Sequence, residues 1–407
     1  MHNRILTNPY ILYSIVWIFV LSVYKLQWST FYSPLSHNLT CFILFSSLIS
    51  FLIGMIMHIK KIFIYRPLLS FSIRKIRLIL ILLYALLFVE FIFARNIPIM
   101  GYIGLGPKME YTEFGLPFIH VIVISGFSVI CLYSYHCALS SNSTRTKKNL
   151  KRYIFLSILP YILIFNRGAM IACIIGLGSL YIMSNISPVK AICKIILSGI
   201  VVLFTFGVLG NIRTDINDVE NVILEIGGAS DDFKNSRIPK EFFWGYIYVA
   251  SPIGNCDYAI RQTPTVLPKI TDMRDFIIFE LLPELLSKRI ANMLQIERQY
   301  NPLVIESLNV STIYARPYMY LGWWGMIYMF MYIMLFITLV ISVIPKGSPY
   351  YVIAIAVINV IVVQSIFDNM LTFMGVIPMV ILICVLSFKY FIKRNAGKKN
   401  INCNCTI

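Results

Sequence analysis

Long apolar stretches divided by short polar connections are the feature that most limits how this chain can fold. Each stretch is close to the length of about 20 apolar residues that a helix needs to cross a bilayer. Charged residues make up only 13% of the 407 residues, about half of the share in soluble proteins, which excludes an ordinary soluble enzyme. The sequence predicts an all-α polytopic membrane protein with about ten transmembrane helices, over 9–25, 39–59, 77–95, 117–139, 153–166, 168–185, 193–210, 319–344, 350–367 and 370–389.

The segment 153–185 admits two interpretations. Pro160 interrupts its first apolar run, and Asn166-Arg167 ends that run early. The preferred interpretation is a tight hairpin of two helices, with its turn just inside the outer interface. The alternative is one long broken span, which would leave nine helices and place the chain ends on opposite sides of the membrane.

Basic residues predict the orientation of the chain. Lys and Arg, without any Asp or Glu, occupy alternate segments: 1–8, 60–76, 140–152, 186–192, 345–349 and the tail from 389. Such residues mark the cytoplasmic side, so both chain ends are predicted to be cytoplasmic. The net charge of +17 therefore faces anionic lipid and does not indicate a nucleic-acid site.

One polar segment, 211–318, is too long to be a simple connection. It holds 14 of the 18 acidic residues and 11 basic ones, and a loop of this length can cross the membrane whatever its charge. We expect a large, mainly helical external loop here, in addition to a shorter external loop over 96–116. The predicted organisation is an N-terminal membrane domain of about seven helices over 1–210, the large loop over 211–318, C-terminal membrane helices over 319–389 and a basic tail over 390–407.

Within the large loop, residues 275–292 place apolar side chains at helical spacing, which predicts an amphipathic helix. Such a helix can lie on the membrane surface as a lid or floor. Packing against the loop's own core is an equal alternative.

Several enzyme motifs are missing from the sequence. It contains no P-loop, no GxGxxG, no HExxH and no GxSxG, so ATP-driven transport and familiar soluble hydrolase chemistry lack support. The first external loop has no DxD pair of the kind that binds a metal-complexed sugar donor. We expect neither a cofactor nor a metal site.

Three arginines stand at the predicted outer ends of helices, where a charge is costly unless it faces a cavity or a partner. Arg167 lies between two apolar runs, Arg213 follows the seventh predicted helix, and Arg316 precedes the eighth. If these helix ends converge, the guanidiniums surround one external pocket. Arg keeps its charge and pairs bidentately with phosphate, which suits a pyrophosphate group. Contact with lipid headgroups or loop acids is the alternative role.

His120 lies where the 96–116 loop returns to the membrane, and an imidazole can act as a base near neutral pH. A polar anchor at a helix end is its alternative role. Glu306 is a second candidate, with Glu113 and Asp257 as rivals. Glu90, near the outer end of the third predicted helix, is expected to be buried and either paired or protonated.

Aromatic residues are frequent in the large loop and at its exit. Trp244, Tyr246 and Tyr248 lie away from any predicted span, and their faces suit the apolar patches of sugar rings. They are therefore candidate glycan-binding residues. Trp323 and Trp324 fit an interfacial belt better.

Three local motifs complete the pattern: Tyr111-Thr-Glu-Phe-Gly-Leu-Pro-Phe-Ile-His120, Asn166-Arg167-Gly168, and Asn309-Val-Ser-Thr-Ile-Tyr314 with Tyr320-Leu-Gly-Trp-Trp-Gly325. Together with the architecture of the whole chain, they resemble the Wzy-type O-antigen polymerases, which join oligosaccharide repeat units in Gram-negative inner membranes. The third motif looks like that family's Asn-x-x-Thr-x-Tyr…Gly-x-x-Gly pattern and is the most specific of the three.

The resemblance implies a metal-independent glycosyltransferase with a large periplasmic loop. Its donor is a glycan on undecaprenyl pyrophosphate and its acceptor a single lipid-linked repeat unit, whose hydroxyl attacks the donor's anomeric carbon. Arg167, Arg213 and Arg316 would then hold the pyrophosphate, and His120 or Glu306 would orient or deprotonate the hydroxyl. The implied glycan contacts are Trp244, Tyr246, Tyr248, Asn309 and Tyr314.

The resemblance also implies membrane lipid, a chain-length regulator and a flippase of the same pathway as partners, with no nucleic acid. An O-antigen ligase uses the same lipid-linked donor and stays an alternative, although the 309–325 block favours the polymerase. A lipid-linked oligosaccharide flippase, which is not an enzyme, is the other alternative. It would need charges along a central cavity, and such proteins usually lack a large external domain.

Overall fold

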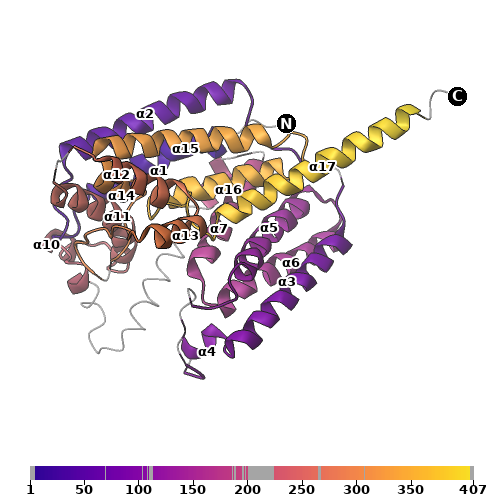
Figure 1. The fold of residues 1–407 in the computed structure, drawn as a ribbon, viewed down its shortest axis with the longest axis horizontal. Helices are drawn as coiled ribbons and strands as arrows, with labels where there is room; N and C mark the ends of the chain where they lie inside the picture. Colours follow the sequence, from indigo (N-terminus) through magenta and orange to yellow (C-terminus); the bar gives the residue numbers. More distant parts are fainter. Residues whose placement is uncertain are drawn as a thin grey trace.

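The computed structural model describes residues 5–403, apart from 69, 103, 108, 110–112, 186, 188, 195–196, 198, 200–223, 265–266 and 307. Within this part the chain is helical and has no strand, and Ser29 and Ala229 form an isolated β-bridge. Long helices run side by side through most of the molecule (Figure 1). The prediction of an all-α chain is confirmed for these residues.

The body of the molecule is a bundle of long helices. Its members are α1 (Pro9–Tyr24), α2 (His37–Ile59), α3 (Ile73–Ala94), α5 (Ile119–Ser140), α6 (Thr144–Leu163), α7 (Arg167–Ser184), α15 (Trp323–Val343), α16 (Tyr351–Gln364) and α17 (Ile377–Cys403), with a 3-10 turn η1 (Ile5–Thr7) before α1. The remaining elements are α4 (Pro98–Tyr102), α10 (Asp231–Lys234), α11 (Phe242–Gln262), α12 (Ile270–Phe276), the π-helix η2 (Ile277–Leu281), α13 (Glu284–Leu294) and α14 (Ala315–Leu321).

The long helices overlap the predicted spans, but α6 begins at Thr144, inside the predicted connection 140–152, and α17 covers Ile377–Cys403 instead of 370–389; most of 193–210 lies outside the described residues. Five described helices, α2, α3, α5, α7 and α15, are long and apolar enough to cross a membrane, while α1, α16 and the first part of α17 are apolar but shorter. Large apolar side chains on α2, α3 and α15 face outward, as they do where lipid replaces water. The chain has the architecture of a helical membrane protein.

Residues 153–185 form two helices, as preferred, and α6 contacts α7. Phe165 ends the connection in a left-handed conformation, with a φ of 55°. Asn166 then starts α7, because its side-chain oxygen accepts a hydrogen bond from the Ala169 amide at 2.9 Å. This is an ordinary N-cap, which satisfies one of the free amides of a helix start.

Helix α16 is the centre of the larger core. Thirteen of its 14 residues are buried, and it packs against α1, α7, α15 and α17. Its one polar mid-helix group, Asn359, donates to the Thr7 carbonyl at 3.1 Å and to the Ser179 hydroxyl at 2.7 Å. A helix that is apolar on all sides has to be enclosed by other helices, and the sequence of α16 meets that requirement.

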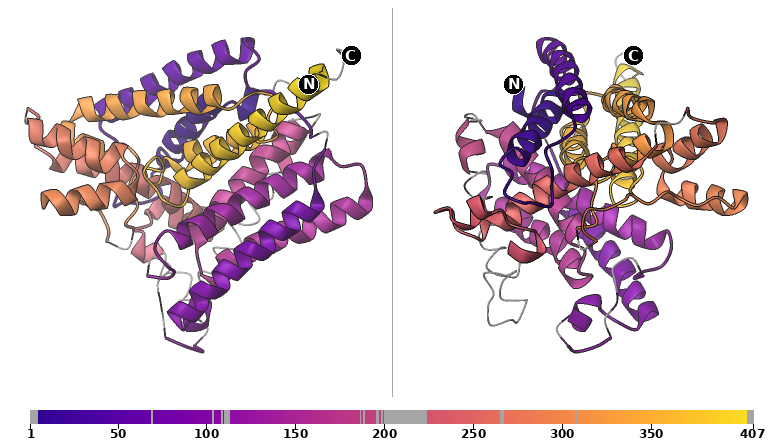
Figure 2. Two further views of the ribbon diagram at one scale, coloured as in Figure 1. Left: turned by 45° about the vertical axis from the view of Figure 1, so that its right-hand side comes forward. Right: turned by 90° about the vertical axis from the view of Figure 1, so that its left-hand side faces the viewer.

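A second core lies among α3, α5, α6 and α7. Helices α3, α5 and α6 lie together in Figure 2, beside the group that contains α1, α2 and α15, and α7 contacts members of both groups. The two groups meet where α7 contacts α16 and α5 contacts α17. The bundle therefore has two halves joined through their central helices.

Helices α10 to α14 gather at one end of the bundle, and the end of α17 extends from the opposite end (Figure 1). Backbone hydrogen bonds join the end formed by α10 to α14 to the α1–α2 connection: the Ser230 amide donates to the Trp28 carbonyl and the Thr30 amide donates to the Gly228 carbonyl, both at 2.7 Å. The buried Asp257 of α11 accepts from the Ser36 amide, at the start of α2, at 3.0 Å. One of the rival bases therefore joins α11 to α2.

The prediction of one continuous amphipathic helix over 275–292 is wrong. The helical segment α12 and the π-helix η2 end before Leu282, which is extended with a ψ of 145°, and α13 starts after Pro283. Proline disfavours helical backbone at the preceding residue and cannot donate to a helical hydrogen bond. The apolar spacing concealed this break.

The conformation and packing of two glycines account for the Gly-x-x-Gly spacing at the end of the 309–325 block. Gly322 has a φ of 59° and a ψ of −142°, a conformation that favours glycine, and it separates α14 from α15. A Cβ at Gly325 would overlap the Pro317 carbonyl oxygen. Their spacing is therefore required by the tight packing of α14 on α15.

We expect Gly325→Ala to destabilise the protein by about 1–3 kcal/mol, because α14 must move away from α15. The measurement is the thermal unfolding midpoint of the detergent-solubilised protein. Gly168→Ala is the matched control, since the nearest atom to its Cβ would be 3.7 Å away. Equal midpoints for the two variants would contradict this account of Gly325.

Candidate functional site

A buried carboxylate at the end formed by α10 to α14 organises the largest cluster of charges in the described part of the chain. Glu280, in the π-helix, has a side chain with no exposed surface. Its Oε1 atom accepts from the Arg316 Nε atom at 2.9 Å and from an Arg298 terminal nitrogen at 3.2 Å. One oxygen thus holds two guanidiniums side by side.

The other groups around Glu280 come from the α16–α17 connection. The Asn369 side chain donates to Glu280 Oε2 at 3.0 Å and to its carbonyl oxygen at 2.8 Å. Asp368 pairs with Arg316 and also accepts from the Asn369 amide at 2.7 Å. Residues distant in the sequence therefore meet in one network of Glu280, Arg298, Arg316, Asp368 and Asn369.

The π-helix explains why Glu280 reaches this position. It adds a residue to the turn, and such insertions often occur at functional sites. Phe279 and Tyr320 stack with ring centroids 6.3 Å apart and belong to a small apolar core beneath the network. The carboxylate is consequently fixed by packing on one side and by arginines on the other.

The network is electrically balanced but unevenly buried. Burial lowers the pKa of the Arg316 guanidinium, but Glu280 and Asp368 outweigh it and hold that pKa above its ordinary value. The Asp368 side chain is 52% exposed, whereas that of Arg316 is 14% exposed. Asp368 is therefore the partner of Arg316 that an incoming anion can displace most easily.

Arg298 has a side-chain donor that makes no hydrogen bond among the described residues. Its Nε atom is buried and has no partner among the described residues, although a terminal nitrogen binds Glu280 and the Phe279 carbonyl. Buried donors are normally satisfied. The sequence reasoning singled out Arg316 but not Arg298 or Glu280, because the pairing depends on a fold that brings 280, 298, 316 and 368 together.

A second pair of ionisable groups lies in the other half of the bundle. The His120 Nδ1 atom is 3.2 Å from Glu90 Oε2, and the other Glu90 oxygen accepts from the Leu116 amide at 3.1 Å. Glu90 is fully buried, and the His120 side chain is 19% exposed. The expectation that Glu90 is buried and paired is confirmed.

Helix α13 contacts the segment before α5. The Arg289 guanidinium of α13 lies over the Phe118 ring, 5.1 Å from its centroid. Phe118 directly precedes α5 and has a φ of 66°. The segment that carries His120 therefore contacts the helix that follows the Glu280 turn.

The other predicted pyrophosphate ligands are only partly described. Arg167 is exposed at the first position of α7, with its guanidinium 4.6 Å from the Phe165 ring centroid. No acidic group pairs with it in the described part of the chain. Arg213 lies outside the described residues. The convergence of all three arginines on one pocket therefore stays a prediction.

The predicted residues of the 304–310 segment are at the surface. Glu306 and Asn309 are both exposed. Asn255 of α11 holds this segment, since its side chain donates to the Leu308 and Val310 carbonyls at 2.7 and 2.8 Å. The position of Glu306 is thus set by a buried amide that the sequence reasoning did not single out.

The aromatic candidates separate into surface and core residues. Trp244 and Tyr248 stack with centroids 6.3 Å apart, and Tyr248 is 43% exposed. Tyr246 is buried against Trp28, and Tyr314 is buried and hydrogen-bonded to the Tyr13 hydroxyl. In this conformation only the first pair presents a ring to solvent.

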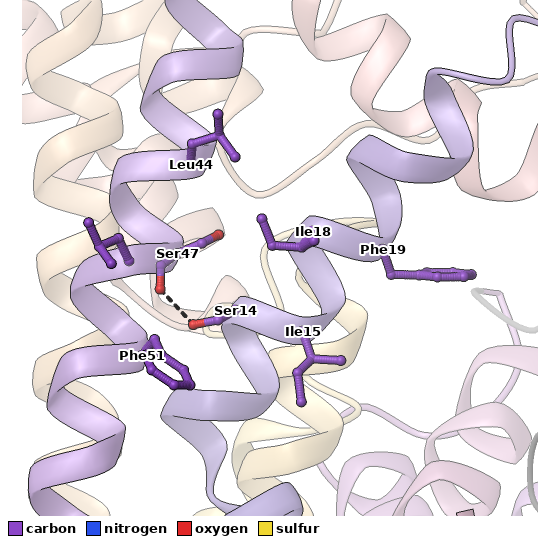
Figure 3. A pocket seen from close by; sticks show the side chains of 8 residues that line it. Ser14, Ile15, Ile18, Phe19, Leu44, Ser47 and Phe51 are labelled. Carbon is purple, nitrogen blue, oxygen red and sulfur yellow. Dashed lines mark hydrogen bonds between the residues drawn. The ribbon is translucent and has the colours of Figure 1, made fainter. Parts of the chain in front are cut away.

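An apolar groove of about 600 Å³ runs between α1 and α2 on the outside of the bundle. Figure 3 shows Ile15, Ile18 and Phe19 along one wall and Leu44 and Phe51 along the other. At its base the Ser14 hydroxyl donates to the Ser47 carbonyl at 2.7 Å. The lining is suited to a hydrocarbon chain.

No protein-family model, curated protein or solved structure matches this chain.

We expect Glu280→Leu to lower the free energy of unfolding by about 3–5 kcal/mol, because two arginines would lose their shared carboxylate. The control is Glu284→Leu, whose partner Lys288 is 74% exposed, and exposed pairs contribute little. Denaturant unfolding in mild detergent measures both. Equal stabilities would show that the network is not what fixes this end.

Proposed function

We propose that this protein is a polymerase that joins undecaprenyl-pyrophosphate-linked oligosaccharide units into O-antigen polysaccharide. The reaction is assigned to the periplasmic face of a Gram-negative inner membrane, with both chain ends in the cytoplasm. The observation that carries the proposal is the pair of arginines held by one buried carboxylate at the end of an apolar bundle. Such a site suits an anionic headgroup whose chain lies in lipid.

The chemistry of the network supports a pyrophosphate ligand. Arg316 and Arg298 share Glu280 Oε1, so their guanidiniums are close enough to bind neighbouring phosphoryl oxygens. An incoming phosphate would replace the half-exposed Asp368 carboxylate on Arg316, while the fully buried Glu280 keeps both arginines oriented. Arg298 is added here to the proposed ligands Arg167, Arg213 and Arg316.

In the proposed reaction, a base gains a proton and the leaving group gains negative charge. The acceptor hydroxyl loses its proton to a base as its oxygen bonds to the donor's anomeric carbon, and the bond from that carbon to the phosphate oxygen breaks. The leaving lipid pyrophosphate gains negative charge, which fixed arginines stabilise. His120 is the proposed base and Glu306 the rival one, and no metal ion is invoked.

The surface of the bundle and the loop support the other parts of the substrate. The groove between α1 and α2 suits an isoprenoid chain, and a neighbouring groove shares Leu44 and Leu48 with it and reaches Phe42. Phe42 packs on Tyr314, with centroids 5.0 Å apart. The stacked Trp244 and Tyr248 are the proposed platform for sugar rings.

A strain that lacks the protein is expected to carry lipid A core with a single repeat unit, because transfer to core would continue without polymerisation. Gel electrophoresis of its lipopolysaccharide would then show one band above unsubstituted core. Unsubstituted core alone would instead identify a ligase. Accumulation of glycan precursors on the cytoplasmic side would identify a flippase, and either result would overturn the proposal.

Arg167→Ala is expected to reduce polymerisation about 10²-fold, the usual cost of removing one group that stabilises transition-state charge. Because Arg167 is exposed, the protein level should stay normal. Arg316→Lys keeps the charge but loses the planar fork that binds Glu280 and Asp368, and we expect it to shorten the glycan strongly.

The assay is glycan length in a complemented deletion strain, with membrane protein levels measured in parallel. Arg237→Ala is the control, since Arg237 is also exposed in the large loop. Arg213→Ala completes the series. Wild-type lengths in the Ala variants at 167, 213 and 316, at normal protein levels, would contradict the pyrophosphate assignment.

A further inference from the structure

The strongest unassigned feature is the buried contact between α3 and the start of α5. Glu90 has no exposed surface, yet both of its oxygens have partners: the His120 Nδ1 atom at 3.2 Å and the Leu116 amide at 3.1 Å. A buried carboxylate is costly unless it is fully hydrogen-bonded. The location of the pair thus requires a reason beyond apolar packing.

The neighbouring backbone is shaped around the imidazole ring. Gly115 has a φ of 99°, and a Cβ at this position would be 2.5 Å from the His120 Nδ1 atom. The Phe114 ring stands edge-on to the imidazole, with centroids 5.6 Å apart and planes at 81°. These contacts restrict the ring to one orientation and leave no room for a side chain between residue 115 and the imidazole.

The hydrogen bonds define which ring nitrogen carries the proton. The Leu116 amide can only donate, so Glu90 Oε1 is an acceptor there. When Glu90 is ionised, its second oxygen also accepts, so His120 donates through Nδ1 and a neutral imidazole carries its lone pair on Nε2. Among the described residues Nε2 has no hydrogen-bond partner, so it is free for a proton from outside.

We propose that Glu90 is a positioning residue: it fixes the tautomer of His120 so that Nε2 can take the proton of the acceptor hydroxyl. This rests on the proposed function. When the acceptor oxygen bonds to the anomeric carbon, its proton passes to Nε2 and the imidazole becomes positive. The carboxylate of Glu90 stabilises that charge without itself becoming protonated, which is the division of roles in carboxylate–histidine pairs.

The geometry predicts the effect of Glu90→Gln. The glutamine oxygen must accept from the Leu116 amide, which leaves the glutamine NH₂ group facing the His120 Nδ1 atom. Nδ1 must then accept, so the proton moves to Nε2 and the ring can no longer act as a base. The substitution is nearly isosteric, so this change does not depend on loss of the fold.

The first test is polymerisation in the complemented deletion strain, with His120→Ala, Glu90→Gln and the double variant. General-base catalysis contributes about 10²–10⁴-fold, so we expect each single variant to lose at least about 10²-fold and the double variant to be no worse than His120→Ala. Added imidazole should restore part of the activity of His120→Ala but not that of Glu90→Gln, where the ring still fills the site. Glu225→Gln and His37→Asn, both exposed at the external end, are the controls.

The second test observes the tautomer directly and needs no substrate. Nitrogen NMR of ¹⁵N-histidine-labelled protein in bilayers, with His120 identified by its loss in His120→Asn, should show a neutral ring protonated on Nδ1. Glu90→Gln should move that proton to Nε2. A wild-type ring protonated on Nε2, or normal glycan lengths in Glu90→Gln at normal protein level, would overturn the role of Glu90. Failure of the deletion strain to accumulate single-unit core would overturn the polymerase proposal instead, whatever the tautomer.

Discussion

The buried Glu280 carboxylate is the constraint on which the end formed by α10 to α14 depends. A carboxylate without exposed surface cannot stay ionised unless positive groups surround it, and Arg298 and Arg316 meet that requirement. Through them the π-helix is joined to the segment after α13 and to the start of α14. Asn369 extends the connection to the α16–α17 turn. One buried charge thereby fixes the relative positions of segments that differ by up to 89 residues in sequence.

The long apolar helices are held together mainly by apolar packing. The larger core is packed around α16, and a buried polar group there such as Asn359 donates to Thr7 and Ser179 within the bundle. The largest ionic network of the described residues lies instead at the end where α10 to α14 gather. The division follows from the solvent: lipid offers no hydrogen bonds, so ionic networks are built where the helices end.

Hydropathy predicted the location of most of the long helices that the structure describes, because length and apolar composition are properties of single segments, but it did not predict the bounds of α6 and α17. Arg316 could be singled out as a candidate from the sequence, since a charge beside an apolar run is visible there, and its proposed role stays a prediction. Its partner Glu280 could not be singled out, because only the tertiary fold brings residues 280 and 316 together. The break before Pro283 is a different case: the sequence carries a proline signal, but the apolar periodicity of 275–292 continues across it and conceals the break. For Tyr246 and Tyr314, the sequence indicated aromatic character but not the packing of loop helices that buries these rings.

The contact between Arg289 and Phe118 has a mechanical consequence. A cation–π contact at an exposed site contributes about 0.5–1 kcal/mol, so it breaks readily at ordinary temperature. The two halves are joined mainly by helix packing: α7 packs on α16, and α5 packs on α17. The spacing between the Glu280 network and the His120–Glu90 pair is therefore set by helix packing, because α5 carries His120 and α16 leads into Asp368 and Asn369. Loss of the contact between Arg289 and Phe118 would leave that packing in place.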